Sequence, residues 1–352
     1  MKIQVIILGC LLLYNASQSQ ESFEHIISTP WNEMLVDMDV DSYGNYYFIG
    51  FKREKDSLNQ CAYLLKLNNS GTIVSEKVFC QNDSSLFFEK IMIINDTVFV
   101  FGYKGSAISS YKNILWKLKL NNDLDILQSG EQKVPANTFE MGIQSILFKN
   151  EKFILLGLVI PMDDMQLYDI GFYKINKNLD SVSTYVDFRQ GIQRGMDFKQ
   201  IDANSGYEVF GNGYYPGTYT SYDELVRFDS NFHFLNVDSV PWQLKNQFTY
   251  KQYDSSSYLL CGNKHYYNPT NFDVGLIRLN ESEDLIKMNH YGKATDTSDY
   301  PSVKKTVDFI YKNCIYLGGT SNLLADQYPW QSEDSWLMLN QLDSNLNIKW
   351  QT

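Results

Sequence analysis

The segment VFVFG at residues 98–102 decides the fold, because five other short apolar segments of the chain also end in glycine. These glycines follow one another at steps of 52, 55, 54, 51 and 57 residues, which is the spacing of a structural repeat. The six segments are YYFIG (46–50), VFVFG (98–102), FILLG (153–157), YEVFG (207–211), YLLCG (258–262) and IYLGG (315–319).

A second pattern keeps step with the first. After each glycine and an intervening loop, the chain repeats an apolar residue, a Lys or Arg, another apolar residue and then Asn or Asp. In the sixth copy Gln341 replaces the cation and the loop is longer. The copies are LLKLN (64–68), LKLN (118–121), YKIN (173–176), VRFD (226–229), IRLN (277–280) and NQLD (340–343). Two landmarks that agree six times indicate six copies of one unit.

Each unit predicts four antiparallel strands. A tight polar turn joins the first strand to the glycine-ended strand, and a longer loop follows. The Lys/Arg strand then leads through a short turn of Asn, Asp, Ser and Gly residues into a fourth strand. Six such units form an all-β β-propeller of six four-stranded blades, in which radial packing protects the sheet edges. A β-sandwich pair and an open solenoid are the competing architectures, and a four-stranded unit of this length favours the propeller.

The mode of ring closure stays open. Residues 26–28 have the pattern of an extra outer strand that would pair with the last blade and lock the ring. The sequence ends at Thr352, within a predicted outer strand. A seventh blade or a sorting module would follow if the natural protein continues beyond this point. We expect six blades within residues 20–352.

Residues 1–19 predict a secretory signal peptide. An apolar run ends at Leu13, and small and polar residues lead to a cleavage point near Ser19. This run is about half the length that a transmembrane anchor needs. A lipoprotein reading at Cys10 is disfavoured because the apolar run continues beyond that cysteine. No later segment is long and apolar enough to span a bilayer, so we expect residues 20–352 to be secreted or displayed at the cell surface.

Composition excludes some classes of protein and partner. The chain has 352 residues, of which 44% are hydrophobic, and this is enough apolar material for a sizeable core. A disordered or fibrous protein is therefore excluded. The net charge is −11 and no basic block is present, so nucleic acid is a poor candidate for a partner.

The cysteines suggest one disulfide. A hairpin that turns around residues 69–72 places Cys61 opposite Cys80 on neighbouring strands, and an exported protein would oxidise such a pair. Two thiols buried as small apolar groups are the alternative. Cys261 ends its strand whereas Cys314 begins the equivalent strand of the next unit, so we expect this second pair to be too far apart. No pair has the spacing of metal ligands.

Motifs for catalysis are not found in the sequence. The four histidines are scattered, and there is no nucleophile elbow, phosphate loop or dinucleotide fingerprint. Asp37, Asp39 and Asp41 alternate as in a calcium loop, but Gly44 is misplaced for that loop. Acidic residues that alternate along a β-strand explain this pattern better than a calcium loop does. We therefore predict no catalytic residue, no metal and no cofactor.

Three long loops after the glycines are rich in aromatic and amide side chains. Tyr and Trp present apolar faces with a polar group, which suits stacking on sugars or anchoring a protein partner. Packing between loops is the alternative explanation for these rings. The candidate ligand-binding residues are Tyr214, Tyr215, Tyr219, His265, Tyr266, Tyr267, Tyr328 and Trp330.

These observations lead to three functional hypotheses. The first is a non-enzymatic β-propeller that binds a glycan or an extracellular protein through its loop-rich face. The second is a hydrolase or lyase that acts on polysaccharide with carboxylates in the central funnel. The third is a repeat scaffold within a larger exported protein.

The repeat text resembles a known group of proteins. An Asp precedes the Lys/Arg-Leu-Asn pattern at 273–280, a related text occupies 334–343, and Ile-Lys-Trp follows at 348–350. In these features the chain resembles the secreted β-propeller proteins of Bacteroidetes-type bacteria, which are often exported by the type IX pathway. The resemblance covers about residues 30–352 and implies an extracellular role without assigning a catalytic residue. The chain departs from that group in lacking its C-terminal sorting domain.

Overall fold

The fold is given by a computed structural model. The described residues are 31–54, 59–82, 84–106, 112–134, 138–161, 169–187, 192–201, 206–214, 221–239, 245–254, 257–265, 272–280, 285–291, 298–301, 309–311, 314–322, 335–343 and 345–351. The predicted signal peptide and the extra strand expected at 26–28 lie outside them.

Every regular element in these residues is a β-strand, and the strands form six antiparallel meanders that we number in chain order. Meanders 1 to 3 are β1 (Trp31–Val40), β2 (Tyr46–Glu54), β3 (Cys61–Leu67) and β4 (Ile73–Phe79); β5 (Ser84–Ile94), β6 (Thr97–Ser106), β7 (Lys112–Leu120) and β8 (Ile126–Lys133); and β9 (Thr138–Lys149), β10 (Lys152–Pro161), β11 (Asp169–Asn176) and β12 (Ser181–Asp187). Meanders 4 to 6 are β13 (Ile192–Gln200), β14 (Tyr207–Tyr214), β15 (Ser221–Phe228) and β16 (Phe234–Ser239); β17 (Lys245–Asp254), β18 (Ser257–His265), β19 (Phe272–Asn280) and β20 (Leu285–Tyr291); and β21 (Ser298–Pro301), β22 (Phe309–Tyr311), β23 (Cys314–Asn322), β24 (Ser335–Leu342) and β25 (Ile348–Gln351). Within the described ranges, no helix is long and apolar enough to cross a membrane.

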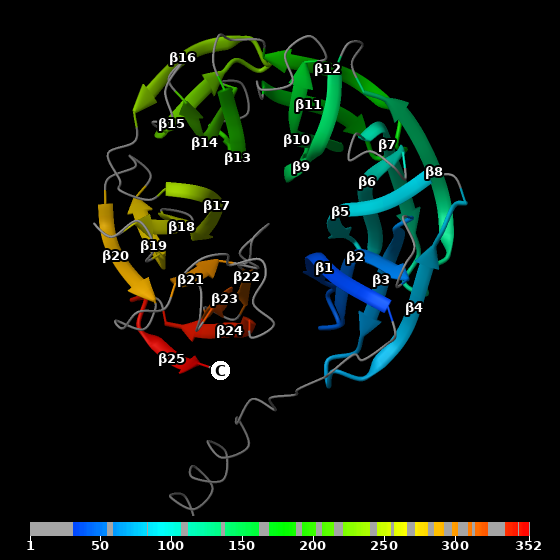
Figure 1. Ribbon diagram of the computed structural model, residues 1–352, viewed down its shortest axis with the longest axis horizontal. Coiled ribbons are helices and arrows are strands. Elements are labelled where there is room, and N and C mark those ends of the chain that lie inside the picture. Colours follow the sequence, from blue (N-terminus) through cyan, green and yellow to red (C-terminus); the bar gives the residue numbers. More distant parts are fainter. Residues whose placement is uncertain are drawn as a thin grey trace, which may run out of the picture.

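The meanders follow one another around a central axis, with the first strand of each innermost and the fourth outermost (Figure 1). Meanders 2 and 3 are joined into one sheet by a single bridged pair between Lys112 and Glu140. In meander 6, β21 and β22 both pair with β23. The radial arrangement of four-stranded antiparallel sheets is typical of β-propellers. The predicted all-β class and the four-stranded antiparallel unit are confirmed.

The recurrent glycine has a steric cause. In meanders 1 to 5 the pairing of the first and second strands shifts register at the glycine of the second strand. In meander 2, for example, Phe88 lies opposite Gly102, and the extra residue Glu89 forms a bulge before Lys90 pairs with Phe101. A Cβ on Gly102 would lie 1.9 Å from the carbonyl oxygen of Phe87. The bulged backbone thus excludes any side chain at this position.

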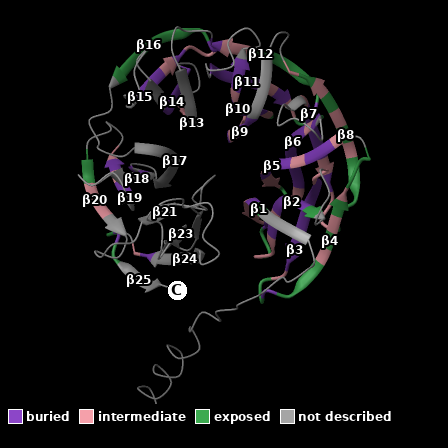
Figure 2. Ribbon diagram, viewed as in Figure 1, coloured by how far each residue is buried: buried purple, intermediate pink, exposed green. Residues whose placement is uncertain are grey.

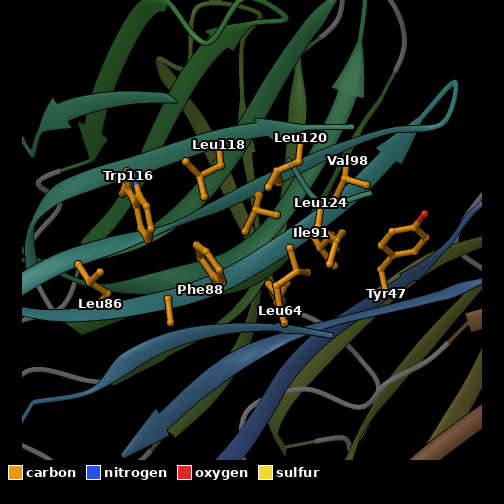
Figure 3. Packing of buried hydrophobic residues seen from close by; sticks show 13 residues of the cluster. Tyr47, Leu64, Leu86, Phe88, Ile91, Val98, Trp116, Leu118, Leu120 and Leu124 are labelled. Carbon is orange, nitrogen blue, oxygen red and sulfur yellow. The ribbon is translucent and has the colours of Figure 1, made fainter. Parts of the chain in front are cut away.

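Apolar clusters fill the spaces between consecutive meanders. The cluster between meanders 1 and 2 contains Tyr47 and Leu64 from the first and Phe88, Trp116 and Leu118 from the second (Figure 3). Further clusters join meanders 2 and 3, and meanders 3 and 4. Burial of each large side chain contributes roughly 1.5–3 kcal/mol, so these contacts hold adjacent meanders together.

Tight turns between the third and fourth strands send one apolar residue into these clusters. The fourth residue of the turn is Leu124, Leu179 or Phe232 in meanders 2 to 4, and each is buried. Their φ angles are +66°, +62° and +69°, in the left-handed region that non-glycine residues seldom adopt. The packing energy of the buried side chain offsets this backbone strain. We call these residues the turn plugs.

The outermost strands carry many exposed residues (Figure 2), and several of these are apolar. Of the large exposed apolar side chains in the described residues, most lie on β4, β8, β12, β16 and β20. The first two residues are both exposed in four of these strands: Ile73 and Val74, Ile126 and Leu127, Phe234 and Leu235, and Leu285 and Ile286.

Cys61 and Cys80 form a disulfide across the last two strands of meander 1. Their Cα atoms are 4.5 Å apart, and the neighbouring pair Ala62 and Phe79 shows that the cysteines stand opposite each other. The bond closes a loop around the β3–β4 hairpin. The side chains of Cys261 and Cys314 lie outside the described part of the structure.

Removing the disulfide should lower stability by about 3 kcal/mol, because the bond restricts the unfolded chain. The measurement is urea unfolding of the Cys61→Ala/Cys80→Ala variant and the native protein, each with and without reductant. Reductant should destabilise the native protein and leave the variant unchanged. An equal response of both proteins would contradict this role for the bond.

At most buried positions an alanine variant is more stable than a glycine variant. Backbone strain at the turn plugs should remove or reverse this difference in stability. Leu124→Ala loses packing, at a cost of about 2–5 kcal/mol, and keeps the strained φ. Leu124→Gly loses one more methyl group but relieves strain of about 1–2 kcal/mol. We expect the glycine variant to be at least as stable as the alanine variant in urea unfolding.

Leu118 is the matched control, since it is buried in the same cluster on strand β7. There glycine should be less stable than alanine by about 1 kcal/mol. The same ranking at both positions would argue against strain at Leu124.

Candidate functional site

The two ends of the meanders differ. At one end, which we call the loop end, the second strand is connected to the third by a longer segment. At the other, the turn end, tight turns join the first strand to the second and the third to the fourth. Gly44 and Asn69 illustrate this, because a Cβ on Gly44 would lie 3.6 Å from the Cβ of Asn69 in the second turn of the same meander.

Two of the candidate ligand-binding residues end strands at the loop end. Tyr214 is the last residue of β14, and His265 is the last residue of β18. Meanders 4 and 5 are neighbours around the axis (Figure 1), so these two strand ends belong to adjacent meanders. The side chains of both residues lie outside the description. The other six candidates lie wholly outside the described residues: Tyr215, Tyr219, Tyr266, Tyr267, Tyr328 and Trp330.

The turn end uses its polar side chains internally. The Asn68 Oδ1 atom accepts hydrogen bonds from the N–H groups of Ser70 and Thr72, two and four residues later. The same pair of bonds forms in four equivalent turns, which begin at Asn121, Asn176, Asp229 and Asp343. These side chains are committed to shaping the turns. In these five units, the Asn or Asp that ends the repeated pattern is therefore part of the scaffold.

The alternating acids of β1 hold meander 1 to meander 2. The Asp37 Oδ2 atom accepts a hydrogen bond from the N–H of Ile91 at 3.1 Å, and Asp39 Oδ2 accepts one from the N–H of Ile93 at 2.7 Å. Both donors belong to β5, the innermost strand of meander 2, whose inner edge has no strand beside it within its sheet. The carboxylates thus satisfy backbone groups of an edge strand. These hydrogen bonds explain the alternating Asp residues that resemble a calcium-binding loop.

Further polar groups line the axis on the innermost strands. The Ser145 hydroxyl of β9 donates a hydrogen bond to Asp197 of β13, and Lys90 of β5 lies 3.9 Å from Asp37. Glu89 is buried, and its carboxylate lies 3.4 Å from the point that a Cβ on Gly142 would occupy. Sequence reasoning did not single out Glu89. Its position in the bulge, next to the residue that pairs with Gly102, is the feature that could have identified it.

These axial carboxylates bind donors of neighbouring strands. Asp37, Asp39 and Asp197 each accept a hydrogen bond that joins two meanders. Within the described residues, no group of three or more His, Cys, Asp and Glu side chains is placed to hold a metal ion. These hydrogen bonds hold neighbouring meanders together.

Asp41 begins the first tight turn, and its environment changes its acidity. Burial of the carboxylate opposes ionisation, but hydrogen bonds from Asn45, Tyr47 and the N–H of Tyr43 outweigh this effect and lower the pKa of Asp41. The Tyr47 hydroxyl is buried beside the same carboxylate, and both effects raise the pKa of Tyr47. The ionised acid is therefore the form that the turn binds.

Comparison with known proteins gives structural likenesses at low sequence identity. No family model matches the sequence, and no curated protein matches it. The β-propeller domain of the Trilobed protease from Pyrococcus furiosus is similar with a TM-score of 0.48 and 9% identity, over 92% of this chain and 84% of that one. A mutant of the Synechocystis apocarotenoid oxygenase is similar with a TM-score of 0.45 and 11% identity, over 74% of this chain. The match spans 62% of the oxygenase, less than two thirds of its length. With TM-scores below 0.5, neither likeness carries an argument about function.

Asp41→Asn should make folding stability less dependent on pH below about pH 4. Because the folded pKa of Asp41 is lowered, its carboxylate stabilises the fold above the unfolded pKa of about 3.9, and this stability is lost as the pH falls through the folded pKa. Asparagine keeps an acceptor for the two turn N–H groups and does not titrate. The measurement is urea unfolding between pH 6 and pH 2.

Asn68→Asp is the reciprocal control, since Asn68 begins an equivalent turn with neutral partners. It should add a loss of stability at acid pH. Identical pH profiles for the native protein and Asp41→Asn would show that this carboxylate does not contribute.

Proposed function

We propose that this chain is a secreted or cell-surface six-bladed β-propeller that binds a glycan or an extracellular protein through its loop end. Each meander corresponds to one blade in this proposal. The binding surface is built around the connections that follow β14, β18 and β23, which carry Tyr215, Tyr267 and Trp330.

The observation that carries the proposal is the difference between the two ends. At the turn end, five equivalent Asn and Asp side chains bind the backbone of their own turns. At the loop end, neighbouring meanders 4 and 5 send out connections rich in Tyr, His and Asn. Aromatic side chains with a polar group suit both stacking on sugars and anchoring of a protein.

The described carboxylates on the innermost strands have structural partners, which supports a binding role in this proposal. A polysaccharide hydrolase or lyase would need two carboxyl groups facing a substrate in the funnel. Asp37, Asp39 and Asp197 instead accept hydrogen bonds from neighbouring strands. We therefore place the functional surface at the loop end rather than at the axis.

Export fits the rest of the chain. The predicted signal peptide at 1–19 would direct the chain out of the cytoplasm. The disulfide between Cys61 and Cys80 suits an oxidising compartment. Both features agree with the resemblance to secreted β-propellers of Bacteroidetes-type bacteria, and we include that origin in the proposal.

The test is binding of the protein from residue 20 onward to immobilised panels of glycans and of extracellular protein fragments. Tyr215→Ala, Tyr267→Ala and Trp330→Ala should each weaken binding at least ten-fold, about 1.4 kcal/mol. A glycan hit and a protein hit distinguish the two classes of partner.

Tyr43→Ala is the matched control, because Tyr43 is an aromatic residue that is 68% exposed at the turn end. It should leave affinity unchanged. Absence of any ligand in both panels, or equal losses for Tyr43→Ala and the loop variants, would overturn the proposal.

A further inference from the structure

Three residues at the junction between meanders 2 and 3 depart from the sequence repeat. Two positions before the repeated cation, Lys117 stands where the five other units have Leu64, Phe172, Leu225, Leu276 and Leu339. Five positions after the Asn or Asp that begins the second turn, Ser181 stands where the others have Ile73, Ile126, Phe234, Leu285 and Ile348. Nine positions after that same Asn or Asp, Gly130 stands where the others have Lys77, Tyr185, Asp238, Asn289 and Thr352.

These three departures meet in space. The Lys117 Nζ atom donates a hydrogen bond to the Ser181 hydroxyl at 3.0 Å, although the two residues belong to different meanders and lie 64 positions apart. A Cβ on Gly130 would lie 3.3 Å from the Cε of Lys117, so a larger residue there would crowd the lysine. Because unrelated changes to a repeat would be scattered over the structure, the contact among these three indicates a shared role.

A bulge in β12 directs Ser181 toward the lysine. Ser181 pairs with Ile175, and Ser183 pairs with Lys174, so Val182 is an extra residue between them. Ile175 belongs to the apolar cluster between meanders 2 and 3. Ser181 lies opposite Ile175 and therefore faces meander 2, whereas Ser183 faces the other side of the sheet.

The lysine and the serine differ in their exposure to solvent. Lys117 is 2% exposed, whereas Ser181 is exposed. Burial lowers the pKa of the Lys117 ammonium, and the charge of Asp180 in the adjacent turn opposes this effect. A neutral amine has a lone pair that can accept the hydroxyl proton of Ser181. An exposed hydroxyl beside a desolvated amine is the arrangement of a nucleophile and its general base.

Gln132 of β8 holds the other side of the hydroxyl. Its Oε1 atom accepts a hydrogen bond from Ser181, and its Nε2 atom donates one to Thr184 Oγ1 at 2.8 Å. The Nε2 group carries a second hydrogen. This hydrogen can be donated to an oxygen on which negative charge develops beside Ser181.

We propose that Ser181 and Lys117 act as nucleophile and general base in the hydrolysis of carboxylic esters. The Ser181 Oγ atom attacks the carbonyl carbon of the ester while its proton moves to Lys117 Nζ. The bond between this carbon and the alcohol oxygen then breaks, and the departing alcohol takes the proton from Lys117. Attack by water on the acyl-serine, with the same proton transfers, releases the carboxylic acid and restores the pair. Ser181 lies on the outermost strand β12 (Figure 1), so the proposal is independent of binding at the loop end.

Labelling of the full chain with a fluorophosphonate tests the nucleophile. Peptide mass spectrometry should place the phosphonyl adduct on Ser181, and Ser181→Ala should not form it. Ser183→Ala is the matched control, because Ser183 is an exposed serine of the same strand that faces away from Lys117. This variant should be labelled at the native rate. Absence of an adduct on Ser181, or equal labelling of Ser181 and Ser183, would overturn the proposal.

Replacement of the lysine separates its chemical role from a structural one. Lys117→Leu restores the residue found in four of the five other units, so its midpoint in urea unfolding should be no lower than that of the native protein. Its rate of labelling at Ser181 should fall at least a hundred-fold, because a general base contributes about 10²–10⁴-fold. An unchanged rate in the folded variant would contradict the role of Lys117.

The pH dependence of the native protein gives a readout that requires no variant. The labelling rate should rise with pH as Lys117 loses its proton, and it should level off below the usual lysine pKa of about 10.4. Hydrolysis of 4-nitrophenyl acetate should follow the same curve and be lost in Ser181→Ala. A rate that keeps rising in proportion to hydroxide through that pH would show that Lys117 is not the base.

Discussion

The close approach of two backbones at the recurrent glycine is the constraint on which the other features depend. The bulge of the innermost strand brings the Phe87 carbonyl to a distance that leaves no room for a Cβ on Gly102. Bulges bend a strand and increase its twist, and this shapes a narrow inner edge that fits beside its neighbours around an axis. Because the register shift recurs at the glycine in meanders 1 to 5, the glycine recurs with it and gives the sequence its period.

Packing between meanders then combines apolar and polar contacts. Apolar clusters fill the faces, and the turn plugs accept left-handed backbone so that a leucine or phenylalanine can reach those clusters. Nearer the axis, Asp37 and Asp39 accept hydrogen bonds from an edge strand that would otherwise present free N–H groups. Asp and Asn, which have low helix propensity and high turn propensity, thereby serve to shape turns and to join neighbouring meanders.

Much of this fold could be predicted from the sequence, because glycine spacing, turn residues and alternation are local signals. The pairing of Cys61 with Cys80 followed from counting around a hairpin. The bulges, and the roles of Glu89 and the β1 acids, could not be predicted, since they depend on which strand of another unit lies beside them. For the candidate site, the high content of aromatic and amide residues was enough to select the loops from the sequence. The strand ends at Tyr214 and His265 place two of those loops on adjacent meanders.

The disulfide also affects how the protein would respond to mechanical force. A chain stretched between its ends lengthens by roughly 3.4 Å for each residue released. Cys61 and Cys80 are 19 positions apart, so about 60 Å of chain stays shielded from tension while the bond is intact. Meander 1 would thus yield a shorter extension than the other meanders. Reduction would release this hidden length.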